Sequence, residues 1–261
     1  MTFDLDPPKN SVIGLRDPTF VSPDSHYEDF DHAHPKEILT WAAQTIDRLA
    51  VASSFQASGL VILHLLRNIR SDLPVLFLDT GFHFPETIAF RDQLIADWDL
   101  TVVDLRGEHG SVASQNELHG TGLYKKDPDT CCHINKVLPL QRALEDYDGW
   151  ISGLRRDQSP LRAGTPIVEA QMLPSGREVF KIHPLAGWSR ADVDEYTAAN
   201  TIPTHPLFER GYASIGCWPC TRPIDLEEHD RAGRWDGSGK AECGIHSFGK
   251  ATGPKETEAE L

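Results

Sequence analysis

The fold class of this 261-residue chain is indicated first by the stretch Leu49-Ala50-Val51-Ala52-Ser53-Ser54-Phe55. Its apolar run predicts a buried strand. The next segment is rich in leucine and isoleucine at helical spacing, which predicts a helix directly after the strand. The apolar residues of that helix are Leu60, Ile62, Leu63, Leu65 and Leu66.

The same alternation of strand and helix continues along the chain. Pro74–Thr80 is predicted to be a second strand, and Pro85 opens a helix that runs to about Trp98, because proline is favoured at the first helical position. Thr101–Leu105 and Trp150–Leu154 are predicted as the third and fourth strands. This order predicts an α/β fold, a parallel twisted sheet flanked by helices and joined by right-handed crossovers.

In such sheets, ligands bind beyond the carboxyl ends of the strands. The segments at those ends are 53–59 and Asp79-Thr80-Gly81. Hydroxyl groups and small residues before a helix can bring backbone N–H groups against a phosphate. Taken alone, Ser53 and Ser58 are more simply interpreted as helix caps, because the loop lacks the GxxxxGK[ST] pattern of Walker-type sites.

Composition limits the function classes. The chain carries 25 Lys and Arg against 39 Asp and Glu, a formal charge of −14, which argues against non-specific nucleic-acid binding. An anionic ligand therefore needs a local basic pocket. No apolar leader follows Met1 and no membrane span is evident, so we expect a cytoplasmic protein. We divide the chain into a flexible segment 1–27, a nucleotide-binding core 28–200 and a C-terminal segment 201–261 with a mobile tail.

The cysteines occur in three places. They form the adjacent pair Cys131-Cys132, the motif Cys217-Trp218-Pro219-Cys220 and the single Cys243. An iron-sulfur cluster takes four thiolates, and a C-x-x-C turn is able to supply two of them. The adjacent pair would supply the other two, so the two halves of the site would have to meet through the fold.

Three other interpretations of the cysteines remain open. A disulfide framework is disfavoured by the odd cysteine count and the missing leader. Structural zinc also takes four thiolates, but its usual pattern is two short C-x-x-C knuckles. A redox dithiol at Cys217 and Cys220 would leave Cys131-Cys132 unexplained.

Several motifs, taken in order, resemble the sulfonucleotide reductases, relatives of the adenine nucleotide alpha hydrolases. The resemblance covers roughly residues 50–246. Its motifs are Ser53-Ser54-Phe55, the segment 78–87 (LDTGFHFPET), the segment 153–160 (GLRRDQSP), Cys131-Cys132, the segment 214–222 (SIGCWPCTR), the segment 231–235 (RAGRW) and the segment 242–246 (ECGIH).

Members of this family that have both cysteine pairs reduce adenylylsulfate (APS) and hold a 4Fe-4S cluster, whereas members without them use the 3'-phosphorylated nucleotide, PAPS. The resemblance therefore implies thioredoxin-dependent (or glutaredoxin-dependent) reduction of APS to sulfite and AMP, in assimilatory sulfate reduction and cysteine biosynthesis. It also implies that Cys131, Cys132, Cys217 and Cys220 hold the cluster.

Cys243 is the cysteine that remains once the cluster ligands are assigned. We expect its thiol to attack the sulfuryl sulfur and form an S-sulfonate. By resemblance, Lys136, Arg231 and Arg234 hold the phosphosulfate, and Arg155, Arg156 and Arg162 belong to the loop near the nucleotide. His83 and His246 lie in the motifs, and we expect His246 to play a supporting role. The expected substrate-binding residues are Ser53, Ser54, Phe55, Asp79, Thr80, Gly81, Arg155, Arg162 and His246.

Three alternatives to APS reduction are kept. PAPS reduction would use the same scaffold. An ATP-dependent RNA thiolation enzyme of the PP-loop group would need a pyrophosphate-binding loop and a basic RNA face, and neither is present in this sequence. A cluster-bearing redox sensor would have no need for Cys243, and the chain has no DNA-reading motif. The oligomeric state and the redox activity of the cluster are not predictable from the sequence.

Overall fold

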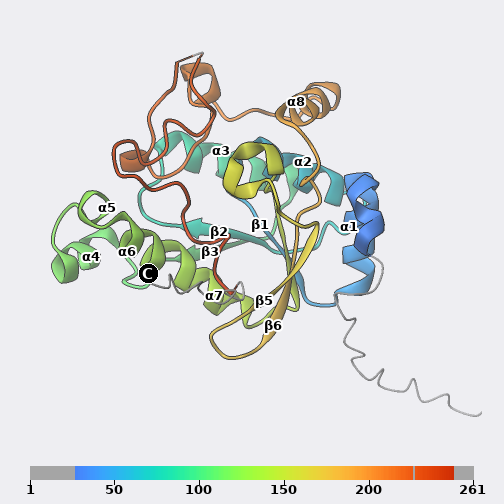
Figure 1. The fold of residues 1–261 in the computed structure, drawn as a ribbon, viewed down its shortest axis with the longest axis horizontal. Coiled ribbons are helices and arrows are strands. Elements are labelled where there is room, and N and C mark those ends of the chain that lie inside the picture. Colours follow the sequence, from blue (N-terminus) through green and yellow to red (C-terminus); the bar gives the residue numbers. More distant parts are fainter. Residues whose placement is uncertain (1–26, 226, 250–261) are drawn as a thin grey trace, which may run out of the picture.

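The computed structural model describes residues 27–225 and 227–249. The end segments 1–26 and 250–261, for which we predicted mobility, lie outside the described residues. The described part is built around a six-stranded sheet with helices on both faces (Figure 1). None of its helices has the length and apolar character needed to cross a membrane.

The element bounds follow the predicted alternation. The strands are β1 (Leu49–Ala52), β2 (Val75–Asp79), β3 (Val102–Arg106), β4 (Gly149–Ser152), β5 (Val168–Met172) and β6 (Glu178–Ile182). The α-helices are α1 (Pro35–Thr45), α2 (Ala57–Leu66), α3 (Pro85–Trp98), α4 (Val112–His119), α5 (Leu123–Lys126), α6 (Pro128–Cys132), α7 (Leu138–Leu144) and α8 (Arg190–Ala199). Short 3-10 turns cover Tyr27–His32, Arg156–Gln158, Pro160–Arg162, Phe208–Arg210 and Trp218–Cys220, and a π-helical turn covers His133–Val137.

The strand order is β3-β2-β1-β4-β6-β5. All neighbouring strands run parallel except β5, which pairs antiparallel with β6. The prediction of a parallel sheet is therefore confirmed for the four predicted strands, β1 to β4. β6 adds a fifth parallel strand and β5 an antiparallel edge, and neither was predicted. The chain builds outward from β1 to β2 and β3, and then returns to the other side of β1 with β4. The gap between β1 and β4 is thus the switch point at which α/β sheets bind ligands.

Two apolar cores cover the two faces of the sheet. Alternate residues of β1 enter different cores: Leu49 and Val51 pack with α1, α2, α3 and α8, whereas Ala50 packs on the opposite face with Leu140 of α7. This alternation follows from the two-residue period of a strand. Residues near the end of the described chain, Ile245 and Phe248, also pack on the α7 side.

The predicted boundaries of β1 and β4 were too long. β1 ends at Ala52 because Ser53 Oγ accepts a hydrogen bond from the N–H of Phe55 at 3.1 Å, and Phe55 itself has a φ of 56°. This local turn aims the chain into α2. Helix α3 matches its prediction from Pro85 to Trp98, and its end is marked by Asp99 in the left-handed region.

The β5–β6 hairpin was missed. Its strands contain fully buried polar residues, Gln171 and Lys181, which hide the apolar alternation expected of a strand. Lys181 Nζ lies 3.1 Å from a carboxylate oxygen of Glu169, and Gln171 accepts a hydrogen bond from the Trp150 indole at 3.1 Å. The turn signal was present, because Pro174-Ser175-Gly176 lies between the two strands.

A buried histidine couples α3 to the segment before the C-x-x-C motif. The N–H of Leu207 donates to His205 Nδ1 at 3.2 Å, so Nε2 carries the proton and donates to Thr87 Oγ1 at 3.0 Å. Burial lowers the pKa of His205 from 6.5 to about 4. As the pH falls, the unfolded chain therefore binds a proton on this residue before the folded protein does, and folding stability is lost between about pH 6.5 and about pH 4.

We expect His205→Asn to lose less stability than the wild type across that pH window. The asparagine carbonyl can still accept from Leu207 but does not titrate. Urea unfolding at several pH values measures this. Parallel plots of unfolding free energy against pH for the two proteins would contradict the assignment.

Candidate active site

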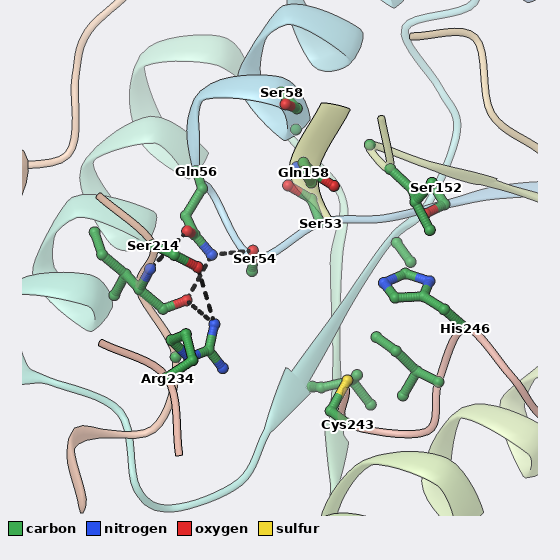
Figure 2. Close-up of a pocket in the computed structure, with 18 of the residues that line it drawn as sticks. Ser53, Ser54, Gln56, Ser58, Ser152, Gln158, Ser214, Arg234, Cys243 and His246 are labelled. Carbon is green, nitrogen blue, oxygen red and sulfur yellow. Dashed lines mark hydrogen bonds between the residues drawn. The ribbon is translucent and has the colours of Figure 1, made fainter. Parts of the chain in front are cut away.

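A cavity of about 240 Å³ lies at the carboxyl ends of β1, β2 and β4. Ser53 and Ser54 line it after β1, and Ser152 lines it at the end of β4. Residues of the chain after α8, among them Ser214, Arg234, Cys243 and His246, complete the lining. Figure 2 shows Ser54, Gln56, Ser214 and Arg234 on one side of the cavity and Ser152, Cys243 and His246 on the other. The structure therefore brings the loop after β1 together with the segment that contains Cys243 and His246.

The serines of the nucleotide loop are not helix caps. Gln56 is the N-cap of α2, and its side chain makes no capping hydrogen bond. Ser53 Oγ accepts from the Phe55 N–H, and Ser58 Oγ accepts from Arg155 Nη1 at 2.6 Å. The capping interpretation is therefore wrong, and the N-terminal end of α2 faces the cavity with hydroxyl groups beside it.

Three predicted substrate-binding residues are not on the cavity wall. Phe55 is fully buried and packs on Phe77 with ring centroids 5.8 Å apart. Asp79 instead accepts a hydrogen bond from the Gly81 N–H at 3.1 Å, and Gly81 uses a φ of 71° to make that turn. These residues shape the loops after β1 and β2.

Gln56 was missed by the sequence analysis. Its Nε2 donates to the carbonyl of Ile215 at 2.7 Å, and its Oε1 accepts from the Ile215 N–H at 2.8 Å. Nε2 also lies 2.9 Å from Ser54 Oγ. One side chain thus ties the nucleotide loop to the chain just before the C-x-x-C motif (Figure 2). No local pattern indicates such a contact, because its two partners are far apart in the sequence.

Arg234 lies against the backbone of the same segment. Its Nη1 donates to Ser214 Oγ at 3.2 Å and to the Ile215 carbonyl at 3.3 Å, and its guanidinium stacks 4.6 Å from the ring centroid of Trp235. A Cβ at Gly216 would clash with the Arg234 guanidinium, so a larger residue there would displace that side chain. Arg234 Nε is buried and has no hydrogen-bond partner among the described residues. This unpaired donor is available to an anion.

His246 presents a second unpaired buried atom at the cavity. Its Nδ1 has no hydrogen-bond partner within the described part of the chain. Burial, together with the nearby charges of Lys181 and Arg162, lowers the pKa of His246 well below its ordinary value. The imidazole is therefore neutral at pH 7 and can accept or donate a hydrogen bond according to its tautomer.

Arg155 and Arg162 line the cavity, but their guanidinium groups bond to protein partners. Arg155 contacts Ser58 and Asp157, and Arg162 contacts Gln158 and Glu242. Arg156, expected in the same loop, turns away from the cavity. It donates to the Thr165 carbonyl at 2.7 Å and to Asp31 at 2.6 Å.

The other four cysteines meet at a second, smaller cavity next to the first. Cys131 and Cys132 end α6, and Cys217 and Cys220 flank the 3-10 turn Trp218–Cys220. That turn is held to the loop after β2, since the Trp218 N–H donates to the Phe82 carbonyl at 2.8 Å. Thr80 Oγ1, predicted to contact substrate, lies 3.3 Å from Cys217 Sγ and lines both cavities.

The thiols affect one another. Burial, with the other three thiols contributing, raises the pKa of Cys131 to about 12, and burial with the neighbouring Cys217 raises the pKa of Cys220 to about 11. All five cysteines are free of disulfides. In the described residues, no three His, Cys, Asp or Glu side chains are grouped so as to hold a single metal ion.

Lys136 lies between the two cavities and lines both. It comes from the π-helical turn His133–Val137. Burial alone would lower the pKa of Lys136, but the thiols of Cys217, Cys243 and Cys132 raise it above its ordinary value. The ammonium group is therefore charged and close to both sets of cysteines.

Comparison with known proteins agrees with this geometry. Residues 48–223 match the phosphoadenosine phosphosulfate reductase domain. Adenosine 5'-phosphosulfate reductase of Streptomyces coelicolor is 44% identical, over 84% of this chain and 90% of that protein. Phosphoadenosine 5'-phosphosulfate reductase of Gloeobacter violaceus is 40% identical, over 82% of this chain and 88% of that protein.

A solved structure is also similar. The phosphoadenylyl-sulfate (PAPS) reductase of Candida auris, in a phosphate complex, superposes with a TM-score of 0.64 at 29% identity, covering 76% of this chain and 97% of that one. The match to the family domain, residues 48–223, includes the strands, the nucleotide loop and all four paired cysteines. The chain belongs to the phosphoadenosine phosphosulfate reductase domain family.

Proposed function

We propose that this protein reduces adenosine 5'-phosphosulfate to sulfite and AMP. The observation that carries the proposal is the convergence of the Cys243 thiol with Lys136, Arg231 and Arg234 on one cavity at the switch point of the sheet. A nucleophile surrounded by cations suits an anionic substrate in a chain whose overall charge is negative. The name of the Streptomyces coelicolor relative supports the same substrate.

The proposed reaction has two parts. In the first, the Cys243 thiolate attacks the sulfur of APS, a bond forms between Sγ and sulfur, and AMP leaves with the electron pair of the broken S–O bond. In the second, a thiolate of a reducing dithiol attacks Cys243 Sγ and releases sulfite. A mixed disulfide remains, and the second thiol of the dithiol resolves it and frees Cys243. The dithiol is oxidised by two electrons, which are the electrons that sulfite has gained.

The cations have separate tasks in this proposal. Arg234 offers its unpaired Nε to the phosphosulfate, and Arg231 and Lys136 add positive charge around the leaving phosphate. The side chains proposed to contact the substrate are Ser53, Ser54, Thr80, Arg155 and His246, all of which line the cavity. Phe55, Asp79 and Gly81 support the cavity wall from behind.

The donor set fits an iron-sulfur cluster. A 4Fe-4S cluster needs one thiolate for each iron, and Cys131, Cys132, Cys217 and Cys220 wall a common cavity. Asn135 and Thr80 add hydrogen bonds to two of these sulfurs, at 3.7 and 3.3 Å. When bound, the cluster would supply a fixed electrostatic field and hold the two cysteine segments together. Lys136, which lies between the cavities, would then be positioned for the substrate.

We infer that residues 28–200 bind the nucleotide and that 201–261 carries the nucleophile to it. The reductant is proposed to be thioredoxin or glutaredoxin, since either supplies a vicinal dithiol. Free thiols and a thiol donor suit a reducing compartment, and we place the protein in the cytoplasm.

PAPS is the second candidate substrate, because the Gloeobacter violaceus relative and the Candida auris structure carry that name. Sulfite release from APS and from PAPS, each with thioredoxin and its reductase, distinguishes the two. We expect APS to be used with a kcat/KM at least about 100-fold higher, because a 3'-phosphate adds two charges that need their own partners. Faster turnover of PAPS would reassign the substrate, and turnover of neither would reject the function.

A further inference from the structure

Glu242, the residue before the proposed nucleophile, is held by two arginines of the cavity wall. Its carboxylate accepts from Arg162 Nε at 2.7 Å and from Arg162 Nη2 at 2.6 Å, a bidentate pair. Arg231 Nη2 lies 3.4 Å from the same carboxylate and also donates to the Ala241 carbonyl at 3.0 Å. Two guanidinium groups thus bind the residues just before Cys243 in the sequence.

This contact is shielded from water. The side chains are exposed by only 8% for Arg162, 19% for Glu242 and 16% for Arg231. Burial alone would raise the pKa of Glu242, but the hydrogen bonds and charge of Arg162 hold it below its ordinary value. The carboxylate is therefore ionised, and removing one partner of a pair at this depth leaves an unpaired buried charge, which costs more than breaking a surface pair.

Each of the three guanidinium nitrogens of Arg162 donates to a protein partner. Nε and Nη2 bind Glu242, and Nη1 binds Gln158 Oε1. Arg234 differs, because its buried Nε has no partner in the described residues. Arg162 therefore faces its own protein, although it lies on the wall of the substrate cavity.

Cys243 has a second anchor on its other side. Ile245 and Phe248 pack in the core beneath the sheet, and the Phe248 carbonyl accepts from Gln171 Nε2 at 3.2 Å. The nucleophile lies between an ionic anchor at Glu242 and an apolar anchor at Ile245. Release of the ionic anchor would leave the chain ahead of Cys243 held by the hydrogen bond from Arg231 to the Ala241 carbonyl and by the Lys240–Asp129 pair, both farther from the thiol.

We propose that Glu242 is a positioning residue and that Arg162 acts on the reaction through it, by holding the Cys243 thiol over the substrate. This inference rests on the proposed function and assigns Arg162 to the nucleophile instead of to the nucleotide. Loss of either partner lowers the rate of sulfur transfer and leaves nucleotide affinity nearly unchanged, since a misplaced reacting group costs rate more than binding.

The test compares Glu242→Gln, Arg162→Gln and the double variant. Glu242→Asp retains the charge and tests for partial rescue. Glu86→Gln is the matched control, because it breaks an Arg–Glu pair with Arg210 that is exposed and does not line the cavity. Three quantities are measured: the single-turnover rate of Cys243 sulfonation at saturating APS, the Kd of AMP, and the rate at which iodoacetamide alkylates Cys243 without nucleotide.

We expect each single variant to sulfonate about 100-fold more slowly while the Kd of AMP changes by less than about threefold. The double variant should lose about as much as either single variant, because the two residues act as a unit. Alkylation of Cys243 should become faster in all three variants and stay unchanged in Glu86→Gln.

Two results would show that Arg162 binds the nucleotide directly and would overturn the inference. One is that the rate losses of the single variants multiply in the double variant. The other is that the Kd of AMP in Arg162→Gln rises in step with the lost rate. An alkylation rate of Cys243 that is the same in Glu242→Gln as in wild type would overturn it as well. If wild type forms no sulfonate but alkylation still depends on Glu242, the anchor stands and the proposed reaction fails.

Discussion

Cys243→Ser is expected to abolish sulfite release from APS, with a loss of at least about 1,000-fold, because a serine hydroxyl at neutral pH is a far weaker nucleophile than a thiolate. The thiol lies on the cavity wall with Lys136, Arg231 and Arg234, and the other four cysteines are grouped around the neighbouring cavity. The substitution therefore removes the reacting atom and leaves the rest of the site in place. Steady-state sulfite production with thioredoxin measures it.

Two properties that the substitution should not change, the affinity for AMP and the iron content, serve as controls for Cys243→Ser. AMP should bind with its wild-type affinity, and the iron content should be unchanged, because Cys243 is not one of the proposed cluster ligands. Wild-type turnover in this variant would remove Cys243 from the mechanism. A loss of iron together with activity would mean that the division of the five cysteines is wrong.

Cys131→Ala and Cys220→Ala are expected to lose the cluster, with iron falling from about four atoms per chain toward none and APS reduction falling at least about 100-fold. Each variant removes one thiol from the smaller cavity, and the two thiols come from segments that the fold brings together. Without the cluster, Lys136 loses the field and the fixed neighbours that orient it.

These variants should also unfold at lower temperature than wild type, since a bound cluster links α6 to the C-x-x-C turn and its binding free energy contributes to folding. Iron and acid-labile sulfide analysis on anaerobically purified protein measures the first effect, and thermal unfolding measures the second. Cys243→Ser is the matched cysteine control for both. Iron retained at about four atoms per chain in either alanine variant would contradict the assignment of ligands.

The sequence predicts the centre of this fold well because its signals are local. Helix α3 is bounded by Pro85 at its first position and by a left-handed residue, Asp99, at its end. The apolar run of β1 is buried on both faces and needs no alternation. Where polar residues are buried, as with Lys181 and Gln171, the same signals fail and the β5–β6 hairpin is missed.

Prediction of the site from the sequence is limited in the same way. The residue types in the motifs predicted where the cavity would form, because the carboxyl ends of neighbouring parallel strands meet. The contacts that set its shape join distant segments: Gln56 with Ile215, and Arg162 with Glu242. The partner of a side chain across the fold has no local pattern, so Arg162 was assigned to the nucleotide from the family resemblance alone.

The intact mass of anaerobically purified protein mixed with APS, in the absence of any reductant, shows whether the Cys243 thiol is the nucleophile. We expect a single sulfonate adduct on wild type, mapped to Cys243, absent from Cys243→Ser and discharged by reduced thioredoxin. A cluster-loaded protein that binds AMP and forms no adduct with APS would contradict this expectation.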